Sequence, residues 1–70
     1  MNTAKVIKKI REVEKLTVSQ MAEIFGVSRV QMHKYINNIS EMSLGKFFSG
    51  MEAMGYSVRI VKNEIELDGV

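Results

Sequence analysis

The sequence has 70 residues, no cysteine and one histidine, so it allows a single small domain and excludes disulfides, thiol catalysis and a multi-histidine metal site. Hydrophobic residues make up 46% of the chain and never run for more than two positions, which indicates a folded protein without a membrane-spanning segment. The net charge of +2 is unevenly divided: residues 1–38 carry seven Lys or Arg against three Glu, whereas residues 39–70 carry three against five acids. The first half is therefore the part suited to a polyanion.

The first predicted element is an amphipathic helix over residues 4–16, because apolar residues recur there at helical spacing with charged residues opposite. The apolar stripe comprises Val6, Ile7, Ile10 and Val13. Four basic side chains of this helix form either a solvated face or a sequence-independent contact with phosphates. They are Lys5, Lys8, Lys9 and Arg11.

Two short helices are predicted next, and each begins at a hydroxyl residue that precedes a glutamine by three positions. Thr17 and Gln20 predict a capping box for a helix that ends at Gly26, which adopts the left-handed conformation without penalty. Ser28 and Gln31 predict a second capping box for the helix that follows.

The helix after Ser28 is predicted to run to about Ile36 and to stop at Asn37 and Asn38, because asparagine tolerates the left-handed conformation. With successive side chains about 100° apart, the inward face comprises Met32, Tyr35 and Ile36. The opposite, outward face comprises Arg29, Val30, His33, Lys34 and Asn37.

A fourth helix is predicted between a serine cap, either Ser40 or Ser43, and Gly55. Its apolar stripe comprises Leu44, Phe47, Phe48, Met51 and Met54. After Gly55 the apolar period changes from about 3.6 to about 2 residues, so residues 56–61 and 64–68 predict a hairpin with Lys62 and Asn63 at its turn. The fold class we expect is therefore mainly α, with a small C-terminal β-strand or hairpin.

The segment 17–37 combines two short helices, Gly26 at the turn and Ala22 four positions earlier, where two crossing helix backbones need a small residue. The run Met21-Ala22-Glu23-Ile24-Phe25-Gly26-Val27-Ser28, with Met32, Tyr35 and Asn37, resembles the helix-turn-helix regulators of the lambda repressor/Cro/Xre type. The resemblance covers residues 4 to about 61. It implies one four-to-five-helix, lambda-repressor-like DNA-binding domain over residues 1–70, with the helix-turn-helix at 17–37 and a strand or hairpin at 56–68.

The resemblance makes residues 28–36 the recognition helix and carries base-edge contacts onto Arg29, Val30 and Lys34, with His33 beside them. Arg29 can grip a guanine with two hydrogen bonds, and Val30 can pack on a thymine methyl group. The candidate phosphate contacts are Thr17, Ser28, Gln31, Asn37 and Asn38. Thr17 and Ser28 are first of all helix caps. The chain departs from the family pattern at Val18, where many members carry a glutamine that touches a phosphate.

We expect a cytoplasmic, bacterial or phage transcriptional regulator that binds a palindromic double-stranded DNA operator as a homodimer, acting as a repressor or autoregulator. Residues 56–61 provide a strand edge that either pairs with a second copy or belongs to a hairpin that caps a monomer. The alternative is an antitoxin-type module that neutralises a protein partner such as a toxin, or contacts polymerase, with or without DNA binding. No constellation of catalytic residues is present, so we expect no enzyme activity, cofactor or metal.

Overall fold

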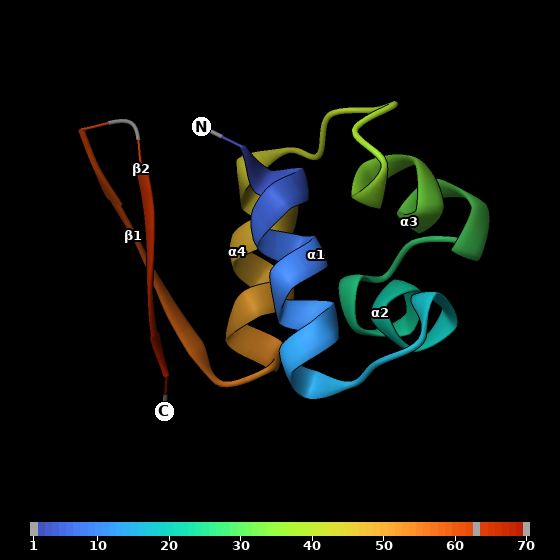
Figure 1. The fold of residues 1–70 in the computed structure, drawn as a ribbon, viewed down its shortest axis with the longest axis horizontal. Helices are drawn as coiled ribbons and strands as arrows, with labels where there is room; N and C mark the ends of the chain where they lie inside the picture. Colours follow the sequence, from blue (N-terminus) through green and yellow to red (C-terminus); the bar gives the residue numbers. More distant parts are fainter. Residues whose placement is uncertain (1, 63, 70) are drawn as a thin grey trace.

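The computed structural model describes residues 2–62 and 64–69, which form four helices followed by a two-stranded antiparallel hairpin (Figure 1). The elements are α1 (Thr3–Glu14), α2 (Val18–Phe25), α3 (Arg29–Ile36), α4 (Leu44–Ala53), β1 (Tyr56–Val61) and β2 (Glu64–Gly69). The mainly helical class expected from the sequence is confirmed. None of the described helices has the length and apolar character that crossing a bilayer requires. Asn63, half of the predicted turn, lies outside the described residues.

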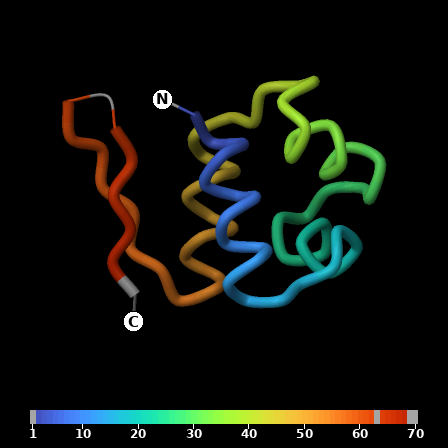
Figure 2. Tube along the Cα trace, in the orientation of Figure 1, coloured from blue at the N-terminus to red at the C-terminus, as the bar shows by residue number. Residues whose placement is uncertain are grey.

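The helices α1 and α4 occupy the middle of the domain (Figures 1 and 2). The pair α2 and α3 lies on one side of them, and the hairpin lies on the other. The helix-turn-helix unit and the hairpin are therefore well separated in space, although they belong to one small core.

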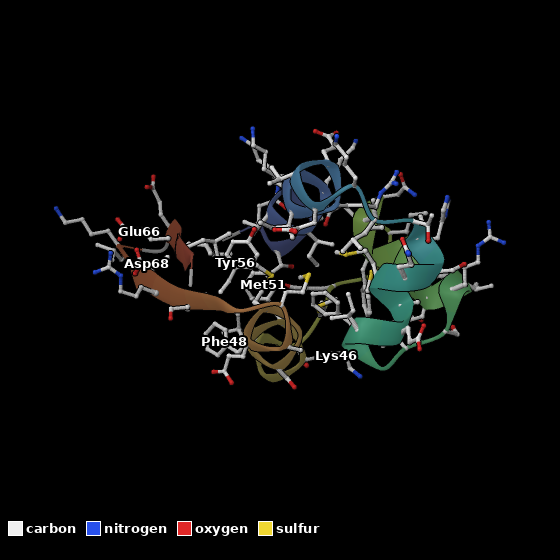
Figure 3. All side chains as sticks on the ribbon, turned by 90° about the horizontal axis from the view of Figure 1, so that it is seen from below. Lys46, Phe48, Met51, Tyr56, Glu66 and Asp68 are labelled. Carbon is white, nitrogen blue, oxygen red and sulfur yellow. The ribbon has the colours of Figure 1, made fainter. Side chains whose placement is uncertain are left out.

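That core is built from side chains of all four helices and one loop residue. Its buried members are Ile7, Ile10, Met21, Ala22, Phe25, Met32, Ile36, Met42, Phe47 and Met51. Three of the five largest fully buried side chains are the methionines Met21, Met32 and Met51, and Figure 3 shows Met51 in the centre of the domain. The methionines therefore fill the core, as expected from their helical spacing.

Two of the predicted apolar stripes extend too far. Val13, in the last turn of α1, is 57% exposed, and Leu44, at the start of α4, is 40% exposed. The predicted end of the first helix at residue 16 is also wrong, because Lys15 adopts a left-handed conformation (φ 54°) and Leu16 donates its N–H to the carbonyl of Arg11 at 3.0 Å. The middle turns of α1 and α4 pack on the core, whereas the last turn of α1 and the first turn of α4 extend past it.

The helix caps follow the local sequence with one exception. Thr17 accepts the Gln20 N–H at 3.1 Å, and Gln20 Oε1 accepts the Thr17 N–H at 2.8 Å, so the first capping box is complete. Ser43 caps α4, which decides between the two serines proposed. The second capping box forms only by half: Ser28 accepts the Gln31 N–H at 3.1 Å, but no reciprocal bond is found among the described residues. Gln31 is half-buried against the domain, whereas Gln20 is exposed and reaches back.

The hairpin packs one face on the helices and turns the other to solvent. Val58 pairs with Leu67 and Ile60 with Ile65, so these side chains share a face, and Val58, Ile65 and Leu67 pack against the helical core. On the outer face Arg59 bridges Glu66 at 3.0 Å and Asp68 at 3.2 Å. The sheet has two strands among the described residues, so each strand keeps one unpaired edge.

Candidate nucleic-acid interface

The outward face of α3 carries all the residues for which base contacts were expected. Arg29, Val30, His33 and Lys34 are exposed, and Val30 is 68% exposed. The opposite face of the same eight-residue helix is anchored, because Met32 and Ile36 are buried in the core. The division between faces therefore agrees with the one expected from the helical spacing.

The position of α3 is set by the residues at its two ends. Gly26, in the left-handed conformation (φ 68°), ends α2, and Ser28 then caps the start of α3. At the other end Asn38 takes the left-handed conformation (φ 58°), and Ile39 donates its N–H to the Lys34 carbonyl at 2.8 Å. Capping hydrogen bonds thus satisfy backbone groups at both ends of α3. They fix the backbone from which the outward side chains project.

Asn37 is already engaged by its own helix. Its Nδ2 donates to the carbonyl oxygen of His33 at 2.9 Å, and the same nitrogen lies 3.3 Å from each ring nitrogen of His33. Asn37 therefore joins the end of α3 to the outward face, because it holds the backbone and touches the ring of His33. A phosphate contact by its amide group would compete with these bonds.

Three further phosphate candidates lie near the N-termini of α2 and α3, whereas Asn38 follows the C-terminal end of α3. Thr17 and Ser28 are exposed caps, and each hydroxyl accepts one backbone N–H. A hydroxyl that accepts a hydrogen bond still has its own O–H to donate, so capping and phosphate contact are chemically compatible. Gln31 is half-buried beside them, on the flank of α3 rather than on its outward face.

One residue of α2 joins the outward face of α3 and was not expected there. Val18 is half-buried: it packs against the core, and it also lines a shallow hollow with Arg29, Val30 and His33. Two valines thus lie beside a cationic and an imidazole side chain, a combination that suits a base edge bearing a methyl group. The sequence did give a signal for this position, because Val18 stands where many members of the resembled family carry a glutamine that touches a phosphate.

The four basic residues of α1 separate into different environments. Lys5 and Lys8 are exposed and border a groove that also includes Asn37 and Asn38 at the end of α3. Lys9 borders another groove, between α1 and the hairpin. Arg11 is half-buried and donates through Nη1 to the Leu16 carbonyl at 3.2 Å, so it is committed to the end of α1 rather than to an open basic face.

The uneven charge along the sequence becomes an uneven charge in space. The outward face of α3 carries two residues that are basic at neutral pH, Arg29 and Lys34, and no acidic residue. The ion pairs found among the described residues are both on the outer face of the hairpin, where Glu66 and Asp68 lie at the end of the molecule opposite α2 and α3 (Figures 1 and 3). The α3 end is therefore more attractive to an approaching polyanion than the hairpin end.

Comparison with known protein families, curated proteins and solved structures gave no match. A function for this chain therefore has to be inferred from its own residues and from how the fold arranges them.

Proposed function

We propose that this chain is a sequence-specific, double-stranded DNA-binding transcriptional regulator of the lambda repressor/Cro/Xre type, acting in the cytoplasm of a bacterium or on behalf of a phage. In this proposal α3 enters the major groove, where Arg29, Val30, His33 and Lys34 meet base edges. The helix N-termini at Thr17 and Ser28 approach the DNA backbone. Repression follows if the bound protein excludes polymerase from an overlapping promoter.

The observation that carries the proposal is the two-sided character of α3. Its buried face, Met32 and Ile36, is held by the core, while its outward face exposes an arginine, a lysine, a histidine and a valine without an acidic neighbour on the helix. Arginine reads guanine through two hydrogen bonds, and a valine offers apolar contact to a thymine methyl group. A helix that served only to close the core would not need this combination on its solvent face.

A homodimer is part of the proposal, because two copies can read the two halves of a palindrome. The hairpin supplies the contact, since each of its strands keeps an unpaired edge. The hairpin and α3 lie towards opposite ends of the 31 Å long axis (Figure 1). Two copies must therefore meet side by side along the hairpins, not end to end, if their recognition helices are to lie one DNA turn, about 34 Å, apart.

The test is a selection of duplexes from a random-sequence pool, followed by a mobility-shift titration with excess nonspecific competitor at near-physiological salt. The DNA upstream of the chain's own gene serves as a second probe, because the regulator is expected to act as a repressor or autoregulator. A discrete complex at nanomolar protein with a two-fold symmetric footprint is the expected result. Diffuse binding that salt abolishes, with no selected sequence, would contradict the proposal and favour an antitoxin-type module that binds a protein partner.

A further inference from the structure

A groove between α1 and the end of α3 joins basic and amide side chains. It is lined by Asn2, Ala4, Lys5, Lys8, Ile36, Asn37 and Asn38. Lys5 and Lys8 are three positions apart on α1, so their side chains leave the helix on one face with Cβ atoms about 5–6 Å apart. Two ammonium groups and three asparagine side chains thus surround one concave strip of surface.

The charge of this groove is uncompensated. Its lining contains no carboxylate, and neither Lys5 nor Lys8 forms an ion pair with any residue in the described ranges. The two lysines also border the groove towards the hairpin, but that groove includes Glu12 and the apolar side chains of Ile65 and Leu67. An anion is therefore attracted to the α3 side of the two lysines. Glu41 borders the adjoining hollow beyond Asn38 and marks the end of the strip.

The groove is linked to the outward face of α3 through Asn37. Asn37 belongs to its lining and is also bonded to His33, which lies on the outward face beside Arg29 and Val30. A duplex that places a major groove over α3 brings one of its backbones past the end of that helix. Asn38, Lys5 and Lys8 border that end of the helix.

We propose that this strip, Lys5, Lys8 and Asn38, binds the phosphodiester backbone of the duplex that α3 reads; the inference rests on the proposed function. The lining offers point charges and amide donors but no aromatic platform for a base, so it is suited to phosphates and carries no sequence preference. Phosphates of one strand follow one another every 3.4 Å along the axis of a duplex, so each of the two lysines can contact one of two adjacent phosphates.

The test is the salt dependence of binding for the double variant Lys5→Gln/Lys8→Gln, measured on the duplex selected by the wild-type protein and on a scrambled duplex. Each lost phosphate contact reduces the slope of log K against log salt by about 0.9, so we expect the slope to fall by about 1.8 in magnitude. The ratio of the two affinities should stay unchanged, because phosphate contacts do not read sequence. Ethylation of phosphates beside the site should block the wild-type protein but not the variant.

The matched control is Lys9→Gln/Lys62→Gln, which removes the same charge from exposed lysines outside the groove. A smaller slope change in this control supports a local contact. Equal salt slopes for the two double variants would overturn the inference, because only net charge would then matter. A loss of the affinity ratio between the selected and the scrambled duplex in Lys5→Gln/Lys8→Gln would also overturn it, because the lysines would then take part in base recognition. Neither result would affect the proposed function, which fails separately if the wild-type protein selects no duplex at all.

Discussion

Tyr56, the first residue of β1, donates its phenolic hydrogen bond to the carboxylate of Glu14, the last residue of α1, at 2.5 Å across 42 positions of sequence. The bond joins the start of the hairpin to the end of α1, the helix that packs against α3. The hairpin is otherwise held by half-buried side chains such as Val58 and Leu67. The two residues therefore form a polar link between the proposed dimer contact and the helical core.

Removing the hydroxyl should loosen the hairpin and leave the helices intact. In Tyr56→Phe we expect faster amide hydrogen exchange over β1 and β2 with unchanged exchange in the middle of α2 and α3, because local opening of a weakly anchored element does not require global unfolding. Glu14→Gln is the matched control, since its amide oxygen still accepts the hydrogen bond without the charge. Identical exchange of the hairpin amides in Tyr56→Phe and wild type would show that the bond has no role in holding the hairpin.

The same link predicts a loss of stability at alkaline pH. The hydrogen bond to Glu14, followed by desolvation and the repulsion of that carboxylate, raises the pKa of Tyr56 above its ordinary value of 10.0. The folded state then retains the phenolic proton at a pH where the unfolded chain has released it, so the contribution is complete below about pH 10 and is lost as the pH rises through the raised pKa. We expect the free energy of unfolding, measured by urea titration, to fall more steeply above pH 10 for wild type than for Tyr56→Phe. If the free energy of unfolding fell equally with pH in both proteins, the hydrogen bond between Tyr56 and Glu14 would make no pH-dependent contribution to stability.

A close approach between α2 and α4 depends on a glycine. A Cβ atom placed on Gly50 would lie 2.3 Å from Cδ2 of Phe25, whose ring is buried in the core. Gly50→Ala should therefore destabilise the fold by about 1–3 kcal/mol through overpacking. Gly45, in the first turn of the same helix, has no atom within 4 Å of such a Cβ, so Gly45→Ala should stabilise the fold by about 0.5–1 kcal/mol. Thermal denaturation of both variants measures the contrast, and equal shifts would mean that the two helices are further apart than the structure places them.

Features that depend on near neighbours in the sequence were predictable. Gly26 and the cap at Thr17 act within four residues of their partners, and the period of the apolar residues separates the faces of α3 correctly. Gly50 was not identified, because the atom it must avoid belongs to Phe25, which lies 25 positions earlier in the chain. Helical spacing indicates which way a side chain points from its own helix, but not which other helix lies beside it.

The same limit applies to the candidate interface. The outward residues of α3 follow from its own spacing, whereas the placement of Val18 beside them depends on the angle between α2 and α3. Lys5 and Lys8 were indistinguishable in the sequence from Lys9, and only the packing of α1 against the end of α3 separates them. The sequence therefore predicted which residues α3 turns outward and left their surroundings open.

The complete capping box at the start of α2 gives a prediction about the scaffold of the interface. Gln20 Oε1 accepts the N–H of Thr17, so Gln20→Ala should lower the free energy of unfolding by about 1 kcal/mol, less the small gain from alanine's helix propensity. Gln20→Glu should preserve or raise stability, because a carboxylate accepts the same hydrogen bond and lies near the positive end of the helix dipole. Urea titration at neutral pH compares the three proteins. A Gln20→Glu protein as unstable as Gln20→Ala would exclude the hydrogen bond as the cause.

Recognition of the operator should depend on Arg29 without any change in the fold. The side chain is exposed and makes no hydrogen bond or ion pair with the described residues, so Arg29→Ala should melt at the wild-type temperature. Loss of a bidentate contact to guanine weakens binding by about 1–3 kcal/mol, which corresponds to roughly 5- to 150-fold in the dissociation constant. The measurement is a mobility-shift titration on the selected duplex, repeated with each guanine of the site replaced.

Arg59→Ala is the matched control for Arg29→Ala, because it removes the same charged group from the outer face of the hairpin, at the other end of the molecule. Its ion pairs with Glu66 and Asp68 are solvent-exposed and worth little, so the fold should remain close to wild type. Its side chain stands on the outer face of β1 and not on the unpaired backbone edge proposed for the dimer, so affinity should remain close to wild type as well. If Arg29 reads a guanine, Arg29→Ala loses discrimination at one base pair and keeps it at the others, whereas a phosphate contact would weaken all duplexes alike. Normal affinity in Arg29→Ala would remove Arg29 from the base-reading set and leave Lys34 and His33 to supply the polar readout.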